Sequence, residues 1–260
     1  MKLLTFVRKL DNVKISIITI AYNSQETIED TIKSVVNQTY SNIEYIIIDG
    51  GSKDNTLSII NKYKDKISTI VSEPDKGIYD AMNKGVEKAT GDLVGILNSD
   101  DFYANETVIE KIASKIKDYD SIYADLVYVD RENTDKVTRY WKAGTYKEGA
   151  FTNGWMPPHP TFFVKKSIYN RFGTYNLKLK SAADYELMLR FLHKEKISTT
   201  YLPEVITKMR VGGQSNVTLS NRLKANKEDQ LAWEINGLKP NFYTLYLKPL
   251  RKVGQFIKKK

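Results

Sequence analysis

The chain has 260 residues, of which 41% are hydrophobic and 27% are charged, and it has a net charge of +9 and no cysteine. This composition is that of a folded globular protein and argues against disorder and against multiple membrane spans. Without cysteine the chain can form neither a disulfide framework nor a thiolate metal site, which fits a cytoplasmic location.

The first hundred residues alternate between strand and helix patterns. Arg8 and Lys9 interrupt the apolar run at the start, so we expect no signal peptide. Apolar runs predict buried parallel strands at 13–22 and 43–48, and the same rhythm predicts further strands at 67–72 and 93–97. Helical spacing predicts a helix that Asn23 caps, followed by helices over 54–63 and 79–89. This alternation indicates right-handed βαβ units and therefore an α/β fold with a mostly parallel central sheet flanked by helices.

The alternation loosens after Asp101. The segment from Trp155 to Pro160 contains three prolines and is expected to be a loop. Around it we predict helices over 105–117 and 182–193, and strands over 121–130, 137–142, 161–164, 197–202 and 205–210. No repeat or flexible linker divides the chain, so we predict one domain over residues 1–236.

The remaining residues, 237–260, form a basic tail. Between residues 239 and 260 there are seven lysines and arginines and no acidic residue. From Pro249 onward, Leu250, Val253, Phe256 and Ile257 recur at helical spacing, which is typical of a helix on an anionic membrane surface. A disordered, solvated tail is the alternative. Because the body is nearly neutral and no groove-reading or aromatic RNA-binding motif is present, we expect no nucleic-acid partner.

Polar residues follow each of the first four predicted strands. In parallel sheets, ligands bind at the carboxyl ends of the strands, so these residues should meet at one edge. They are Tyr22-Asn23, Asp49-Gly50-Gly51, Glu73-Pro74-Asp75 and Asn98-Ser99-Asp100-Asp101.

Four segments in this order resemble glycosyltransferase family 2, whose members share the nucleotide-sugar-binding GT-A fold. They are SIITIAYNSQETIEDTIKSVVNQTY, IEYIIIDGGSKDNT, EPDKGIYDAMNKGVEKATGDLVGILNSDD and AADYELMLR, and the resemblance spans residues 13 to 216. It implies a metal-dependent hexosyltransferase that moves one sugar from a nucleotide-sugar donor, most commonly a UDP-sugar, to a hydroxyl of a glycan or lipid-linked glycan, with inversion. The PDKGIYDAMNKG form is similar to bacterial members that build exopolysaccharide, capsule or lipopolysaccharide.

The segment Asn98-Ser99-Asp100-Asp101 matches the family's D-x-D metal motif. Asp100 matches the final Asp, which implies a metal ligand, whereas Asn98 replaces the first Asp. Hard oxygen ligands suit Mn²⁺ or Mg²⁺, which stabilise a leaving diphosphate. We therefore predict Asp100 and Asp101 as metal ligands, and Asn98 and Ser99 on the donor side. A plain polar loop, with Asp101 capping the next helix, is the alternative.

The resemblance also implies residues that bind the donor. Asp49 matches the family Asp that accepts a hydrogen bond from the nucleotide base, although Asp-Gly is also a common turn pair. Met82 stands where many members have Arg, and Lys76 is a candidate replacement cation. The other predicted donor contacts are Ala21, Tyr22, Gly77 and Asn83.

Asp184 is the candidate catalytic base. An inverting displacement needs a group that takes the proton of the acceptor hydroxyl, and Asp184 matches the family carboxylate at the start of a late helix. Ala183 replaces the Glu that often precedes it, and Glu186 is the fallback. Alternatively, Asp184 is an acidic residue favoured by the helix macrodipole.

Three further residues are candidates for acceptor contact or closure of the site. His159, one of only two histidines, lies in the proline-rich loop. Arg210 and Ser215 occupy a segment that closes over the diphosphate in many relatives.

Two other function classes remain open at this stage. A nucleotidyltransferase or other nucleotide-sugar enzyme would favour a glycine-rich basic loop after the first strand, which is absent, and no G-x-G-x-x-G marks a dinucleotide oxidoreductase. The basic tail is also compatible with a non-catalytic membrane-binding module.

Overall fold

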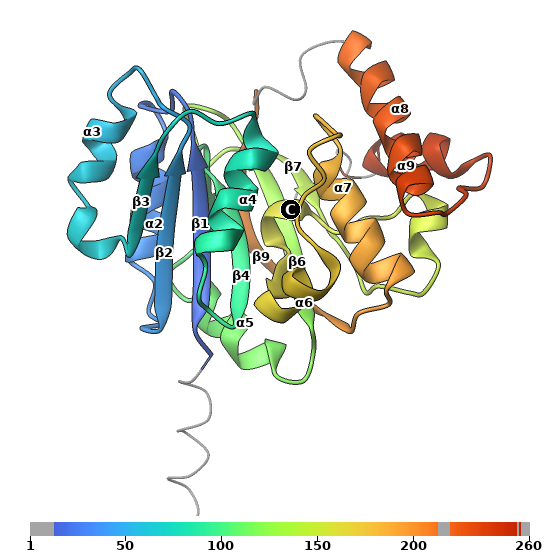
Figure 1. Ribbon diagram of the computed structural model, residues 1–260, viewed down its shortest axis with the longest axis horizontal. Helices are drawn as coiled ribbons and strands as arrows, with labels where there is room; N and C mark the ends of the chain where they lie inside the picture. Colours follow the sequence, from blue (N-terminus) through green and yellow to red (C-terminus); the bar gives the residue numbers. More distant parts are fainter. Residues whose placement is uncertain (1–12, 213–218, 254, 256–260) are drawn as a thin grey trace, which may run out of the picture.

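The computed structural model describes residues 13–212, 219–253 and 255, and its central sheet has nine strands. One half of the sheet is parallel and has the order β3-β2-β1-β4 (Figure 1). Its strands are β1 (Ile15–Ala21), β2 (Ile43–Asp49), β3 (Thr69–Ser72) and β4 (Leu93–Asn98). These are the four strands that the sequence pattern predicts, and the α/β class is confirmed.

The other half of the sheet is mixed. Strand β8 runs antiparallel to β4 and is joined to it by only two residue pairs, Leu93 with Lys165 and Val94 with Val164. Beyond β8 the order continues β6-β9-β5, with β6 parallel to β9 and β7 paired to β6. These strands are β5 (Asp101–Tyr103), β6 (Ser121–Val129), β7 (Val137–Trp141), β8 (Phe163–Lys165) and β9 (Thr199–Arg210).

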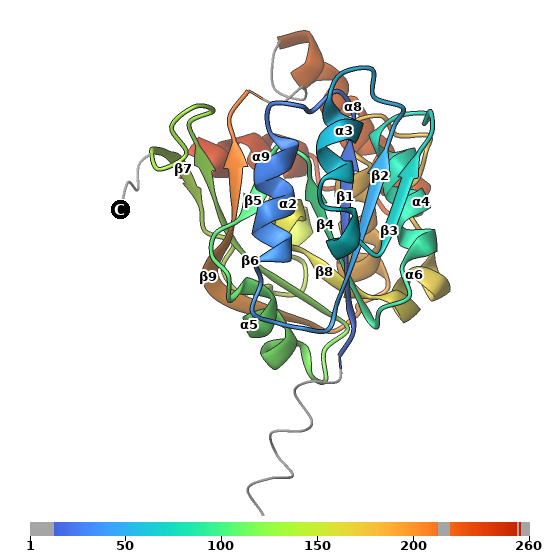
Figure 2. The same ribbon diagram turned by 90° about the vertical axis from the view of Figure 1, so that its left-hand side faces the viewer.

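Successive strand residues point to opposite faces of the sheet, and both faces are apolar, so helices cover both of them. Ile17 faces one apolar cluster and Ile18 the other. Figure 2 shows α2 and α5 on one side of the sheet and α4 and α6 on the other. The first face packs against α2 (Ile28–Val36), α3 (Thr56–Asn61) and α5 (Val108–Ile116), and the second against α4 (Ile78–Lys88), α6 (Lys166–Phe172), α7 (Ala183–Met188) and its π-helical continuation η4 (Leu189–Lys194).

The described part of the basic tail rests on the body. It forms α9 (Thr244–Val253), which follows α8 (Leu219–Ile235) and lies against the short helix η2 (Ala150–Asn153). The Thr244 hydroxyl donates to the carbonyl of Thr152 at 2.6 Å. The predicted helix starts at Pro249, whereas α9 starts five residues earlier and contains that proline. The domain boundary at residue 236 stays a prediction, as does any role of residues 256–260, which lie outside the described part.

Two local predictions, and the alternative interpretation of Asp101 as a helix cap, differ from the structure. Asn23 is not an N-cap: it has a positive φ of 48°, and α2 begins only at Ile28 because the intervening residues form a turn pinned to the loop after β2. The two late strands are one strand, β9, which passes through a bulge opposite Asp125. Asp101 starts strand β5 and does not cap a helix.

A buried carboxylate ties the amino-terminal end of the sheet together. Glu44 on β2 accepts hydrogen bonds from the Lys14 ammonium at 2.8 Å and from the Thr90 backbone at 2.7 Å, and the Ser16 hydroxyl also donates to it. Burial alone would raise the pKa of Glu44, but these hydrogen bonds outweigh it and lower the pKa to about 2. Charged Glu44 therefore stabilises this end of the fold, opposite the edge where the polar residues gather.

Within the part of the chain that the structure describes, every helix is too short or too polar to cross a bilayer.

Candidate active site

The sheet register places the predicted polar residues side by side. Ala21 pairs with Asp49, Asp49 pairs with Ser72, and Ile20 pairs with Asn98, so the carboxyl ends of four strands meet at one edge. The sequence-based expectation that these polar sets converge is confirmed in geometry. The edge lies between the N-terminus of α4 and the N-terminus of α7 (Figure 1).

The aromatic side chain of Tyr22 stands at this edge and is 54% exposed, whereas Ala21 is buried. A Cβ added to Gly50 would lie 2.3 Å from the Asp75 carboxylate and 3.4 Å from the Tyr22 ring. Gly50 therefore keeps Tyr22 and Asp75 close across the strand ends. An exposed aromatic ring is a surface on which a nucleobase can stack.

Asp49 is completely buried at the end of β2. Its carboxylate accepts hydrogen bonds from the backbone and hydroxyl of Ser52 and, at 2.6 Å, from the hydroxyl of Ser72. The carboxylate thus holds the turn after β2, and a nucleotide base can reach it only if Ser52 gives way. The base contact of Asp49 stays a prediction.

The N-terminus of α4 opens toward the same edge. Gly77 has a φ of 116°, a conformation that favours glycine, and its N–H donates to Asp75 at 2.8 Å. Lys76 is exposed. Asn83 lies six residues after Gly77 on α4, and its side-chain amide makes two 2.9 Å hydrogen bonds with the backbone of Tyr175, which the sequence did not indicate. It fastens the loop before α7 to α4, and its contact with a donor stays a prediction.

The acidic segment after β4 is tightly packed. The Ser99 hydroxyl shares a 2.7 Å hydrogen bond with the Ser24 hydroxyl, and the Asn98 amide donates to Asp101 at 3.2 Å. Asp100 is half-buried and Asp101 fully buried. Burial raises the pKa of Asp100, and burial together with the Asp100 charge raises the pKa of Asp101 well above its ordinary value. Two acidic groups this close are stabilised by a cation.

The oxygens in this segment fit a hard divalent cation. Among the described residues, Asn98 Oδ1 and Asp101 Oδ1 are buried acceptors without a hydrogen-bond partner, which is costly unless a donor or cation meets them. The described residues contain no cluster of three or more His, Cys, Asp or Glu side chains arranged as a complete metal site. The protein would therefore supply few ligands, as Mg²⁺ and Mn²⁺ sites on phosphates commonly require.

Arg210 braces the acidic segment. It is 4% exposed, donates to the Asp100 carbonyl at 2.9 Å, pairs with the Asp30 carboxylate on α2, and stacks over the Phe102 ring. Its guanidinium is thus already engaged, and a role in closure would require it to leave these partners. Ser215 lies outside the described residues.

Asp184 lies in the first turn of α7 and is half-buried. Its Oδ1 accepts a 3.1 Å hydrogen bond from the Tyr79 hydroxyl on α4. Glu186, the fallback base, is 1% exposed. Its carboxylate accepts a hydrogen bond from the Arg190 guanidinium and another from the Asn236 amide, each at 2.9 Å. Both oxygens of Glu186 already have hydrogen-bond partners, which favours Asp184 over Glu186, and the role of Asp184 as base stays a prediction.

His159 lies beside Asp184. Its Nε2 shares a 2.8 Å hydrogen bond with the Tyr175 hydroxyl, and the Tyr175 ring stacks on Tyr79 with centroids 5.8 Å apart. Burial lowers the pKa of His159, and the nearby Asp184 charge opposes this shift. Tyr79 and Tyr175 thus connect the two predicted candidates, His159 and Asp184. The sequence analysis singled out neither tyrosine.

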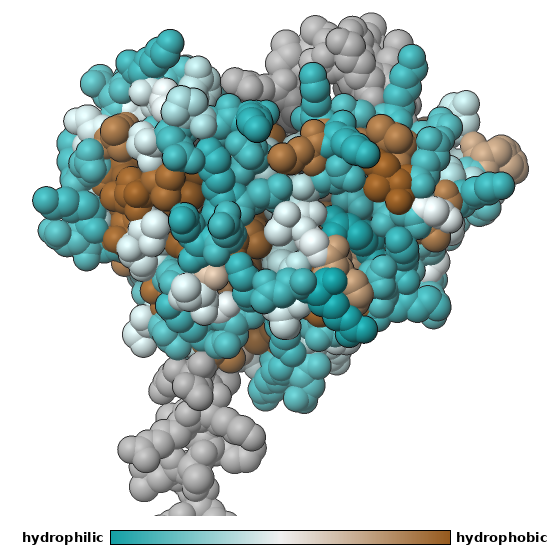
Figure 3. Space-filling model, viewed as in Figure 1, coloured by the Kyte–Doolittle hydropathy of each residue, from teal (hydrophilic) through white to brown (hydrophobic). Residues whose placement is uncertain are grey.

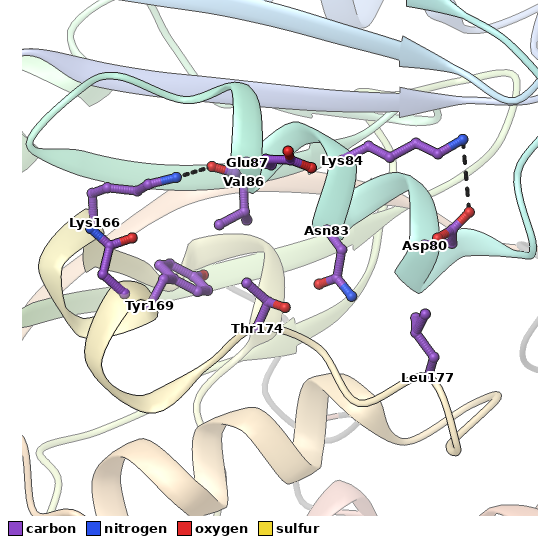
Figure 4. A pocket seen from close by; sticks show the side chains of 10 residues that line it. Asp80, Asn83, Lys84, Val86, Glu87, Lys166, Tyr169, Thr174 and Leu177 are labelled. Carbon is purple, nitrogen blue, oxygen red and sulfur yellow. Dashed lines mark hydrogen bonds and ion pairs between the residues drawn. The ribbon is translucent and has the colours of Figure 1, made fainter.

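A cavity of about 620 Å³ lies between α4 and α6. Figure 4 shows Asn83 pointing into it and Lys84 reaching toward Asp80. Of the residues predicted for the site, only Asn83 lines this cavity. The cavity is therefore separate from the edge where the strand ends meet. Its lining residues are Asp80, Asn83, Lys84, Val86, Glu87, Lys166, Tyr169, Asn170, Thr174 and Leu177.

A sheet with a parallel half, an acidic segment after the fourth strand of that half and a carboxylate in the first turn of a late helix together form the arrangement that the GT-A resemblance implies. The chain belongs to Glycosyl transferase family 2, whose sequence profile matches residues 16–185. The family resemblance drawn from the sequence is confirmed.

Two relatives illustrate the range of this family. The chain is 29% identical over 205 residues to a PGL/p-HBAD biosynthesis glycosyltransferase of Mycobacterium bovis, an alignment that covers 77% of this chain and 78% of that protein. It is 31% identical over 230 residues to WfaP of Escherichia coli, described as a UDP-Glc:alpha-D-GlcNAc-diphosphoundecaprenol beta-1,3-glucosyltransferase, covering 86% of this chain and 85% of that protein.

Two solved structures share the fold. Staphylococcus aureus TarS 1–349 in complex with UDP has a TM-score of 0.63 at 19% identity, covering 84% of this chain and 65% of that one. The mannosyltransferase PcManGT of Pyrobaculum calidifontis, in complex with GDP-Man and Mn²⁺, has a TM-score of 0.67 at 16% identity, covering 91% of this chain and 69% of that one. The chain thus spans about two thirds of each solved structure.

Proposed function

We propose that the protein transfers one sugar from a UDP-sugar to a hydroxyl of a glycan or lipid-linked glycan, with inversion, in the synthesis of a bacterial cell-surface polysaccharide. The acceptor oxygen attacks the anomeric carbon, the bond from that carbon to the diphosphate oxygen breaks, and the hydroxyl proton passes to Asp184. The products are the glycosylated acceptor and UDP.

The observation that carries this proposal is the contact between Asp184 on α7 and Tyr79 on α4, at 3.1 Å. Tyr79 lies two residues after Gly77, at the helix N-terminus that faces the strand ends. An N-terminus of this kind favours a diphosphate through its free N–H groups and its dipole. The candidate base and the proposed diphosphate site therefore lie at the same edge of the sheet, and an inverting displacement requires the anomeric carbon to lie between them.

A divalent cation, Mn²⁺ or Mg²⁺, would neutralise the charge that develops on the leaving diphosphate. Asp100 would hold it, with Asn98 and Asp101 contributing the two buried oxygens that lack hydrogen-bond partners among the described residues. The Mn²⁺ in the PcManGT complex supports this choice of ion.

The donor and acceptor follow from the relatives. WfaP is named for a UDP-glucose donor and a GlcNAc-diphosphoundecaprenol acceptor, and TarS was solved with UDP. The exposed ring of Tyr22 offers a stacking surface for the uracil of such a donor. Family membership favours this function over a nucleotidyltransferase or a non-catalytic membrane-binding module.

The lipid-linked acceptor suggests a location at the cytoplasmic surface of the membrane, reached through the C-terminal segment 239–260. Phe242, Tyr246 and Leu250 are 89%, 72% and 61% exposed. Tyr246 and Leu250 are four residues apart and lie on one side of α9, and Phe242 lies in the turn before this helix. Figure 3 shows apolar side chains at the surface near α8 and α9. Exposed Lys239 and Arg251 flank them, and such a basic, apolar face suits an anionic lipid surface.

The test is a panel of UDP-glucose, UDP-N-acetylglucosamine and GDP-mannose, each with and without Mn²⁺. We expect UDP-sugars with Mn²⁺ to raise the melting temperature, because a ligand stabilises the fold according to its excess over its Kd. We also expect UDP release that depends on an undecaprenyl-diphosphate-linked N-acetylglucosamine acceptor. If only GDP-mannose raised the melting temperature, the donor would be GDP-mannose and not a UDP-sugar.

A further inference from the structure

We infer that Tyr79 is a positioning residue for Asp184, holding its carboxylate in one orientation at the edge where the strand ends meet. This inference rests on the proposed role of Asp184 as the base. Tyr79 and Asp184 are 105 positions apart and belong to the two halves of the domain. The hydroxyl therefore links the donor-side helix directly to the base.

The geometry defines one orientation of the carboxylate. Tyr79 donates to Oδ1 of Asp184 at 3.1 Å, and among the described residues no hydrogen bond reaches Oδ2. A carboxylate held through one oxygen leaves the other available to accept a proton from an acceptor hydroxyl. Free rotation about the Asp184 side chain would otherwise spread the two oxygens over several directions.

Tyr79 itself is held on several sides. It is 8% exposed, and its ring lies nearly parallel to that of Tyr175, with an interplanar angle of 16°. Tyr175 is fastened twice, by its hydroxyl to His159 and by its backbone to Asn83. These contacts leave Tyr79 little freedom to swing away, so its hydroxyl is a fixed reference point for Asp184.

The hydroxyl also keeps its proton over the working range. Burial, followed by the neighbouring Asp184 charge, raises the pKa of Tyr79 far above its ordinary value. The titratable groups that face Asp184 from the elements around it are Tyr79 on α4, His159 on the proline-rich loop and Tyr175 on the loop before α7. Of these, Tyr79 is the one that donates to the carboxylate.

The decisive variant is Tyr79→Phe, which removes the hydroxyl and keeps the ring that stacks on Tyr175. With UDP-glucose, Mn²⁺ and the lipid-linked acceptor, we expect kcat to fall about 10- to 100-fold and the donor KM to change by less than about twofold. The double variant Tyr79→Phe/Asp184→Asn should be no slower than Asp184→Asn alone, because the hydroxyl acts only through the carboxylate.

Tyr146→Phe is the matched control. It removes another partly buried tyrosine hydroxyl, which donates to the carbonyl of Leu192 at 3.0 Å in the continuation of the same helix, away from Asp184. We expect it to lower stability without changing kcat. Equal kcat losses in Tyr146→Phe and Tyr79→Phe would mean that any lost hydroxyl has this effect, and the inference would be wrong.

A second measurement does not depend on the substrate. A double-mutant cycle on urea unfolding with Tyr79→Phe and Asp184→Asn should show coupling of at least about threefold in the unfolding equilibrium constant. Additive effects of the two substitutions would show that Tyr79 and Asp184 do not interact, and the inference would be wrong. If Asp184→Asn itself retained turnover, the proposed base would fail, whereas an inactive Asp184→Asn beside a fully active Tyr79→Phe would overturn only the role of Tyr79.

Discussion

The ammonium group of Lys248 on α9 lies 3.6 Å from the centre of the Tyr185 ring on α7. It also pairs with the Asp229 carboxylate at 2.6 Å, and the Tyr185 hydroxyl accepts from the Trp233 indole at 2.9 Å. Tyr185 directly follows Asp184 in the chain. The C-terminal helix is thus packed against the helix that carries the candidate base.

Gly154 allows α9 to approach the body. It has a φ of 71°, and a Cβ added there would lie 2.5 Å from the backbone nitrogen of Lys248. We expect Gly154→Ala to displace α9, to lower stability by about 2 kcal/mol and to speed proteolytic cleavage between residues 237 and 243. Limited proteolysis followed by mass spectrometry measures this.

Gly144→Ala is the control that separates the effect of the steric clash with α9 from the effect of backbone strain at a positive φ. Gly144 has the same φ of 71°, yet no described atom lies within 4 Å of its added Cβ. We expect it to lower stability without faster cleavage of the tail. Identical cleavage in the two variants would show that α9 is not held by its fit against Gly154.

Asp184→Asn should abolish transfer while the donor still binds. The amide keeps the shape of the side chain but cannot take a proton, so we expect kcat to fall by about 10³-fold, within the range for general-base catalysis, with UDP affinity unchanged. Steady-state kinetics and UDP titration measure the two effects. Near-normal turnover would refute the base assignment.

Asp100→Ala should remove metal-dependent donor binding and leave the fold intact. Asp100 is only half-buried, and its backbone carbonyl, which holds Arg210, remains in the variant. We expect the Mn²⁺-dependent increase in melting temperature with UDP to disappear, while the melting temperature without ligand stays close to that of the original protein. An unchanged increase would take Asp100 out of the metal site.

Glu44→Gln should change how stability depends on pH. The pKa of Glu44 is about 2 in the folded protein against an ordinary value of 4.5, so its contribution is fully present above pH 4.5 and is lost as pH falls toward 2. A shift of this size corresponds to about 3 kcal/mol. Urea unfolding should show the variant less stable at pH 6, with the difference shrinking between pH 4.5 and 2. A pH-independent difference would contradict this.

The exposed apolar residues of the C-terminal segment should bind lipid. We expect the triple variant Phe242→Ser/Tyr246→Ser/Leu250→Ser to reduce binding to phosphatidylglycerol vesicles at low salt by at least about tenfold. Leu177→Ser is the control, because Leu177 is 52% exposed and lies outside this segment. Equal vesicle binding by the triple variant and the original protein would argue against a membrane role.

The parallel half of the fold could be predicted because its signals are local. Each of β1 to β4 contains a short run of β-branched or apolar residues, and strand ends meet wherever parallel strands pair in register. The helix cap at Asn23 was wrong because its side chain accepts a hydrogen bond from Lys53 at 2.9 Å, 30 positions away. Nothing in the local pattern indicates that contact.

In the candidate site, too, local signals could be predicted from the sequence and long-range contacts could not. The motif residues Asp100 and Asp184 could be singled out from the sequence, and the structure places both near the strand ends. The tasks of Asn83, Arg210 and Tyr79 could not be predicted, because each depends on a partner 92, 110 or 105 positions away. Long-range pairs of this kind are decided by packing between the two halves of the sheet.

The joint between β4 and β8 consists of two residue pairs, and it has a consequence for how such an enzyme can diversify. Few backbone hydrogen bonds between strands bind the parallel half to the half that bears Asp184, although both apolar clusters contain residues of both halves. Side chains reaching across from α4, Tyr79 to Asp184 and Asn83 to Tyr175, complete the alignment. We therefore expect changes in the loops of the second half to preserve donor binding only where Tyr79 and Asn83 keep these partners.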